Sequence, residues 1–250
     1  LTFRNAKKVA LTVEKKIRTG TLTVQGDHRF TFELYASDKV TKLGSRTVTV
    51  PDGAADGDVV TTSFDGLSQG QTYYLREISA IEDFALTAME GSGGMAVSQD
   101  GGFYRFTVPV SNAGITVTAT NTYLFARVTI LKVNAKDGRP LSGAAFKAYR
   151  MRGGIPISAH TGEWTYIADG EYSVLLPLTS AAGNTFRIQE FSAPAGYRND
   201  HPYADVTVLP GDSLVHGTFD SQSMTGGTTA QNDAAMLKEL IYPNYQGSVI

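Results

Sequence analysis

Cysteine is absent from the 250-residue sequence, and tryptophan occurs only once. Without cysteine, the chain forms no disulfide bond and no thiolate metal site. Long apolar segments are missing too, because no run reaches the roughly 18 residues that a membrane-spanning helix needs. We therefore predict no membrane insertion within this stretch of chain.

An excess of charge of one sign is equally absent. The 22 Lys and Arg residues are offset by 24 Asp and Glu residues, which gives a formal net charge of −2. The basic residues are scattered, whereas nucleic acids and anionic membranes bind surfaces where positive charge is concentrated. This balance excludes nucleic acid as a predicted partner.

Motifs for cofactors and for catalytic turnover are also lacking. The sequence has no phosphate-binding loop, no dinucleotide fingerprint and no nucleophile elbow. The acidic run at residues 52–58 lacks the full ligand spacing and the closing glutamate of a calcium loop, which favours a plain acidic turn. We predict no cofactor, no metal site and no enzyme with turnover.

What the sequence does contain is a series of short segments in which apolar and polar residues alternate. Clear examples, rich in β-branched and aromatic residues, are residues 9–13, 30–34, 46–50, 103–108 and 115–119. Asp-Gly, Pro-Gly and Gln-Gly turn signals separate such segments. The pattern predicts an all-β chain of two tandem immunoglobulin-like or prealbumin-like β-sandwich domains, each of about 100–125 residues.

The order of these segments repeats along the chain. In each half a lysine near the end of the first segment is followed by an aromatic segment, a turn, a glutamate and a closing asparagine. The lysine, glutamate and asparagine are Lys15, Glu77 and Asn121 in the first half, and Lys132, Glu190 and Asn232 in the second. We predict sandwiches at residues 9–124 and 125–236, a preceding closing strand or linker at 1–8, and a linker toward a next domain at 237–250.

The three polar residues continue the core-facing rows of their segments. Side chains alternate faces along a strand, so Lys15 shares a face with Leu11 and Val13, and Asn121 with Val117 and Ala119. Buried lysine, glutamate and asparagine are costly to desolvate unless they meet. We therefore expect each set to gather in its core, with Lys16 as an alternative to Lys15 that strand parity disfavours.

Such a cluster has a definite chemistry. Burial lowers the pKa of a lysine and raises the pKa of a glutamate, which favours a neutral amine beside a protonated carboxyl. The amine can attack the asparagine carboxamide while the acid polarises it, expelling ammonia and leaving an isopeptide bond. Each domain would react once, so this is self-modification.

The second half resembles the collagen-adhesin B-type (CnaB-like) domains of Gram-positive adhesins and pilins. The matching segments are residues 128–133 (VTILKV), 140–146 (PLSGAAF) and 190–197 (EFSAPAGY). The resemblance implies that Lys132 is the amine, Glu190 the acid and Asn232 the acceptor. Asp233 is an alternative acceptor that would lose water.

The first half resembles the longer isopeptide-forming domains of major pilins. The shared segments are residues 13–15, 30–34, 73–77 and 121–123. The resemblance implies a structural stalk of a wall-anchored adhesin or pilus subunit, extracellular on a Gram-positive bacterium. Its partners would be neighbouring domains of the same surface protein. The alternative function is direct binding of a host glycan or matrix protein, through residues 151–178 with Trp164 and Tyr166.

Overall fold

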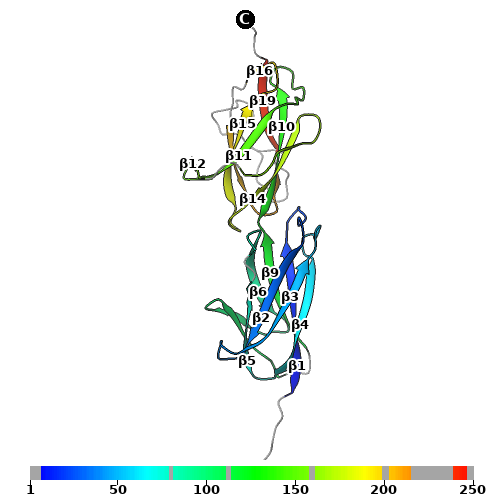
Figure 1. The fold of residues 1–250 in the computed structure, drawn as a ribbon, viewed down its shortest axis with the longest axis vertical. Helices are drawn as coiled ribbons and strands as arrows, with labels where there is room; N and C mark the ends of the chain where they lie inside the picture. The colour runs from blue at the N-terminus through cyan, green and yellow to red at the C-terminus, as the bar shows by residue number, and fades with distance from the viewer. Residues whose placement is uncertain are drawn as a thin grey trace, which may run out of the picture. The chain divides into compact units, whose positions relative to one another are not determined.

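The computed structural model of the chain describes residues 7–78, 81–110, 114–157, 161–198, 203–214 and 239–246. Within these residues the secondary structure consists of β-strands without a helix, which confirms the predicted all-β class. The chain divides into two compact units, one made of Leu1–Thr19 and Thr23–Tyr123, the other of Gly20–Leu22 and Leu124–Ile250. Two sheets build each unit (Figure 1).

The first unit contains a four-stranded and a five-stranded sheet. The four-stranded sheet has the order β4-β1-β9-β6, and the five-stranded sheet has the order β3-β2-β5-β8-β7. The strands are β1 (Lys8–Arg18), β2 (His28–Tyr35), β3 (Lys42–Val50), β4 (Val59–Ser68), β5 (Thr72–Glu77), β6 (Phe84–Gly91), β7 (Val97–Asp100), β8 (Phe103–Thr107) and β9 (Ile115–Tyr123).

Strands β1 and β9, the first and last of this unit, pair in parallel at the centre of the four-stranded sheet. Alternate residues of both strands are buried, as their period-two patterns predict. On β1 the buried row runs Leu11, Val13, Lys15 and Ile17. Lys15 therefore occupies a core position by strand geometry.

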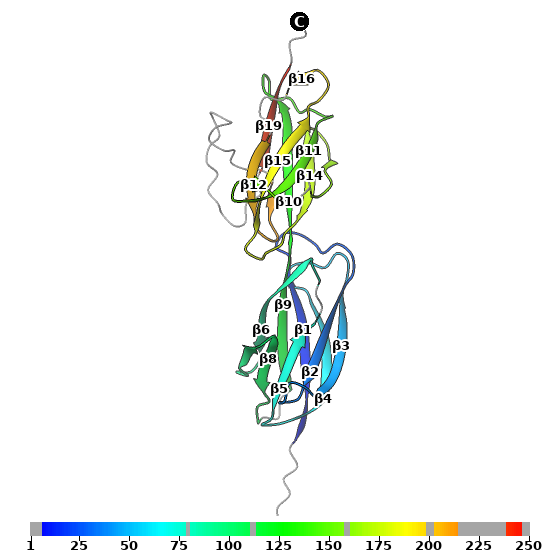
Figure 2. The same ribbon diagram turned by 60° about the vertical axis from the view of Figure 1, so that its left-hand side comes forward.

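The second unit has the same two-layer arrangement. One sheet has the order β13-β14-β10-β19-β16 with β18 also on β10, and the other has the order β12-β11-β15-β17 (Figure 2). The strands are β10 (Phe125–Asn134), β11 (Ala145–Arg152), β12 (Ile155–Pro156), β13 (Thr165–Tyr166), β14 (Glu171–Pro177), β15 (Asn184–Ser192), β16 (Tyr197–Arg198), β17 (Tyr203–Val208), β18 (Ser213–Leu214) and β19 (Glu239–Gln246).

Strand β19 differs from the sequence expectation for its segment. Residues 237–250 read as a linker, yet Glu239–Gln246 pairs in parallel with β10 and belongs to the second sandwich. Pro243 lies inside the strand. Proline is depleted in strands because it has no backbone N–H to donate, so it masks the local strand signal here.

Candidate functional site

The site of the first unit begins with Lys15, which is completely buried although it carries an amine. Its neighbour Lys16 is half-buried on the opposite face of β1. The parity of the strand therefore selects Lys15 as the core lysine. Its partner across the β1–β9 ladder is Ala119, and Asn121 follows two residues later on β9.

Glu77 reaches both of these residues from the facing sheet. It ends β5, and its side chain is 4% exposed. Lys15 Nζ donates a hydrogen bond to Glu77 Oε2 at 2.9 Å, and Asn121 Nδ2 donates one to Glu77 Oε1 at 2.7 Å. One carboxyl group thus bridges the amine and the carboxamide inside the core.

Phe30 covers the Lys15 amine on another side. The ammonium nitrogen lies 4.2 Å from the centre of this ring, which is itself fully buried. Burial lowers the pKa of Lys15 from 10.5 to about 8, against the opposing effect of Glu77. An appreciable fraction of the amine is therefore neutral, and hence nucleophilic, near pH 8.

The carboxamide of Asn121 uses its nitrogen but not its oxygen in the hydrogen bonds of the core. Asn121 is 2% exposed, and its Oδ1 is buried without a hydrogen-bond partner among the described residues. A buried acceptor left in this state is costly. A half-turn of the amide would place Oδ1 against Glu77, a contact that is favourable only when Glu77 carries a proton.

The second unit places Lys132 and Glu190 together in the same way. Lys132, on β10, donates a hydrogen bond from Nζ to Oε2 of Glu190, on β15, at 2.9 Å, and both side chains are 0% exposed. Burial lowers the pKa of Lys132 and raises that of Glu190, each opposed by the partner's charge. The core therefore favours the neutral pair more than water does.

The two acids occupy matching positions in their sheets. Glu77 pairs across the ladder with Phe32 on β2, and Glu190 pairs with Phe146 on β11. These aromatic residues begin corresponding segments of the sequence repeat. The repeat read from the chain is therefore a repeat of ladder register as well.

Two residues at these sites escaped the sequence analysis. Phe30 carried a signal, since it shares the parity of Phe32, but only the facing sheet shows that it covers an amine. Gly170 has a φ of +83°, and a β-carbon there would collide with the Lys132 carbonyl oxygen. Its own carbonyl accepts a hydrogen bond from Lys132 N at 2.7 Å, so it positions the backbone of the lysine.

The predicted acceptor of the second unit, Asn232, and its alternative Asp233 lie outside the described residues. Lys132 and Glu190 are therefore the two members of that set whose geometry is known. The other predicted binding segment contains Trp164 and Tyr166. Trp164 packs on Phe146 with ring centres 5.4 Å apart, whereas Tyr166 is 47% exposed.

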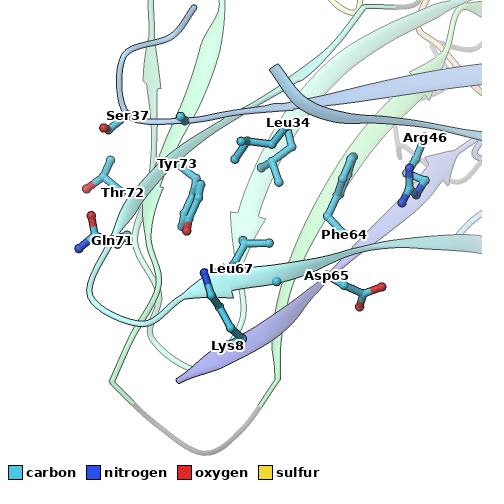
Figure 3. Close-up of a pocket in the computed structure, with 13 residues that line it drawn as sticks. Lys8, Leu34, Ser37, Arg46, Phe64, Asp65, Leu67, Gln71, Thr72 and Tyr73 are labelled. Carbon is cyan, nitrogen blue, oxygen red and sulfur yellow. The ribbon is translucent and has the colours of Figure 1, made fainter. Parts of the chain in front are cut away.

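A hollow of about 440 Å³ lies elsewhere in the first unit (Figure 3). Leu34, Phe64, Leu67 and Tyr73 contribute to its wall. The cluster of Lys15, Glu77 and Asn121 does not line it. Its charged lining residues are exposed; they are Lys8, Arg46 and Asp65. The hollow thus lacks the buried acid–amine pair that gives the core site its chemistry.

The chain is thus a tandem β-sandwich protein with a buried amine–acid pair in each sandwich. Two family models match it, one in each half. Residues 126–220 match the SpaA prealbumin-like fold domain, and residues 11–124 match DUF5979, a domain of unknown function. The first match confirms the predicted prealbumin-like fold for residues 126–220.

Several solved structures are similar to the chain. A point mutant of the shaft pilin SpaA from Lactobacillus rhamnosus GG is 14% identical with a TM-score of 0.42, covering 98% of this chain and 100% of the pilin. A C-terminal fragment of the pilus adhesin SpaC from the same organism is 15% identical with a TM-score of 0.40, covering 98% and 99%. A Mobiluncus mulieris adhesin containing intramolecular disulfide, isopeptide and ester cross-links is 16% identical with a TM-score of 0.32, covering 46% and 41%.

Curated protein sequences give no match to this chain. No helix among the residues that the structure describes is long and apolar enough to cross a membrane.

Proposed function

We propose that this chain is a structural stalk of an adhesin or pilus subunit, in which each sandwich is locked by an isopeptide bond formed by its own residues. The observation that carries this proposal is the Glu77 carboxyl, which contacts both the Lys15 amine and the Asn121 carboxamide within a closed core. The family-model match of residues 126–220 supports the pilus or adhesin setting.

The reaction follows from the three groups present. Neutral Lys15 Nζ attacks Asn121 Cγ, while protonated Glu77 donates a hydrogen bond to the carboxamide oxygen. Glu77 then passes its proton to Nδ2, the nitrogen that already lies 2.7 Å from Oε1, and takes up the proton that Nζ loses as the new bond forms. The Cγ–Nδ2 bond breaks, ammonia leaves, and a Nζ–Cγ amide joins β1 to β9.

The surroundings favour the product over the unreacted core. Before reaction the core holds a charged pair that has lost its water, and buried charges are retained only at a desolvation cost. After reaction the amine and carboxamide have become one neutral amide, and Glu77 keeps the proton. The reacting groups are held together by folding, which supplies the effective molarity of an intramolecular reaction.

The same role is proposed for Lys132 and Glu190 in the second unit, with a carboxamide or carboxyl on the closing segment as acceptor. The sequence pattern predicts Asn232, or alternatively Asp233, as this acceptor. The setting that we propose is the extracellular surface of a Gram-positive bacterium, with neighbouring domains of the same surface protein as partners. The chemistry occurs once per domain and is not turnover.

Intact-mass spectrometry of the full chain tests this proposal. The expected wild-type mass falls short of the sequence mass by one ammonia for each bond formed. Glu77→Gln keeps the shape of the side chain but removes the acid, so it should restore one ammonia to the mass. A wild-type chain with the full sequence mass would overturn the proposal.

Glu33 supplies a matched control within the same unit. Like Glu77 it is a buried glutamate on the five-stranded sheet, but its partners are Tyr35, Arg76 and Lys42. Glu33→Gln should leave the mass deficit intact. If both substitutions abolish the deficit, disturbed folding rather than lost acid chemistry explains the result.

Direct binding of a host glycan or matrix protein is the second candidate function. The observation that favours it is the exposure of Tyr166 and Ile167, which are 47% and 55% accessible beside β13. Because Trp164 packs on the core residue Phe146, the informative substitution is Tyr166→Ala. Glycan and matrix-protein arrays with the wild-type chain and this variant test the candidate, and identical signals from both would reject it.

A further inference from the structure

Strand β19 occupies the place in the second unit that β9 occupies in the first. In the first unit, β1 is flanked by the antiparallel strand β4 and the parallel strand β9. In the second unit, β10 is flanked by the antiparallel strand β14 and the parallel strand β19 (Figure 2). The short strand β18 also pairs in parallel with β10, but only at Arg127 and Val128, so β19 is the parallel neighbour that lies beside Lys132, as β9 lies beside Lys15.

The ladder register locates the counterpart of Asn121 on β19. Lys15 pairs with Ala119, and Asn121 stands two residues further on, opposite Ile17. Lys132 pairs with Tyr242, and the residue two positions further on, opposite Asn134, is Asn244. The two asparagines thus hold the same register position relative to their lysines.

Other residues of β19 fit this position less well. The strand carries three residues with a side-chain carbonyl, namely Glu239, Asn244 and Gln246. Glu239 pairs with Thr129 and is an odd number of residues from Tyr242, so it has the opposite parity. Gln246 shares the parity but stands four residues beyond Tyr242 and is in register with Tyr197 on β16.

The backbone on both sides of Lys132 is already engaged. On one side Lys132 is in register with Tyr242 of β19, and on the other its N–H donates to the carbonyl of Gly170. A strand formed by the segment around Asn232 therefore has no free edge of β10 beside Lys132. This occupation favours an acceptor on β19.

We propose that Asn244 is the isopeptide acceptor of the second sandwich, an inference that rests on the proposed function. Lys132 Nζ attacks Cγ of Asn244 and the Cγ–Nδ2 bond breaks. Glu190 delivers a proton to Nδ2, which leaves as ammonia, and takes up the proton that Nζ loses. The new Nζ–Cγ amide joins β10 to β19. Residues 237–250 are then part of the covalent closure of the domain.

Intact-mass spectrometry of the full 250-residue chain tests this assignment in a Glu77→Gln background. The first bond cannot form in this parent, so any mass deficit comes from the second unit. The parent should lack one ammonia, and a tryptic digest should contain a branched peptide joining Lys132 to Asn244. Asn244→Ala should regain the ammonia, whereas Asn232→Ala and the same-strand control Gln246→Ala should retain the deficit.

Asn244→Asp gives a second readout that does not require deleting the side chain. An aspartate loses water where asparagine loses ammonia, and both leave the same amide. Cross-linked Asn244→Asp should therefore have the same final mass as the cross-linked parent.

The possible failures are distinguishable. A deficit that survives Asn244→Ala and disappears in Asn232→Ala overturns the assignment but leaves the proposed function standing. If the parent instead lacks one water, and Asp233→Ala restores that water, the assignment is likewise overturned and the proposed function still stands. A Glu77→Gln parent with the full sequence mass overturns the second bond itself, and with it this inference.

Discussion

Two buried glutamates of the first unit show how the surroundings of a carboxyl decide its chemistry. Glu33 accepts hydrogen bonds from Tyr35, Arg76 and Lys42, which together hold the pKa of this carboxyl at about 2. Glu77 instead faces one buried amine and one carboxamide. Glu33 is therefore fixed as an anion, whereas the Lys15–Glu77 pair holds a proton that either member can carry.

This shared proton predicts how cross-linking depends on pH. The reactive form, a neutral amine beside a protonated acid, contains the same number of protons as the ion pair, so its population is independent of pH while the pair keeps that proton. Burial lowers the pKa of Lys15 to about 8, so above that pH the pair as a whole loses the proton that the reaction needs. We expect the rate to be constant below about pH 8 and to fall by about tenfold per pH unit above it.

The measurement begins with chain purified unfolded from inclusion bodies and verified to have the full mass. Refolding is started by dilution into buffers from about pH 6 to about pH 10, and the loss of ammonia is followed by mass spectrometry. A rate that rises steadily through pH 8 would mean that the free amine reacts without help from the acid.

At the scale of secondary-structure elements, the central feature of each unit is a parallel pair formed by its first and last strands. Parallel ladders are slightly less stable per residue than antiparallel ones. In the first unit, β1 and β9 also lie about a hundred residues apart in the chain, so their pairing closes a long loop. The proposed covalent bond between them would act where closure of the loop has its highest entropic cost.

Thermal stability should report this closure one domain at a time. In the chain-entropy description of cross-links, joining Lys15 to Asn121 contributes about 4–5 kcal/mol to the free energy of unfolding. Asn121→Ala prevents the bond while keeping the Lys15–Glu77 ion pair, and we expect it to lower the Tm of the first unit by about 15–25 °C. Calorimetry of the full chain measures this shift.

Asn244→Ala provides the matched change in the second unit. It should move the other calorimetric transition and leave that of the first unit in place. A single substitution that moves both transitions equally would show that the two units unfold together, contrary to the expectation of separately closed domains.

At the scale of the whole molecule, the proposed bonds determine which residues a pulling force stretches. Force that enters along β1 reaches Lys15, crosses to Asn121 and leaves along β9, so the residues between them carry no load. The argument applies to each unit by itself, because each bond lies within its own sandwich. A tandem chain of this kind extends little under tension.

Single-molecule pulling on the full chain tests this expectation. The wild-type chain should show no unfolding event from the segment between Lys15 and Asn121. Asn121→Ala should add an event of roughly 350 Å, because an extended chain spans at most about 3.3–3.6 Å per residue. An event of that length in the cross-linked wild-type chain would contradict the proposed force path.

The sequence by itself determined the period-two patterns, and with them most strands and the faces that their side chains share. Lys15, Asn121 and Glu190 are buried because they continue apolar rows, a local property that can be read without coordinates. The repeat of a core-facing lysine and glutamate was visible for the same reason. The strand at residues 239–246 was missed because Pro243 interrupts its local pattern.

Only the tertiary structure decided which of these rows meet. Glu77 bridges Lys15 and Asn121 because the two sheets face one another in a particular alignment, and Phe30 covers the amine for the same reason. The position of Asn244 relative to Lys132 depends on the register of a ladder between strands about a hundred residues apart. Register is set by hydrogen bonds and packing between distant segments, so no local pattern in the chain contains it.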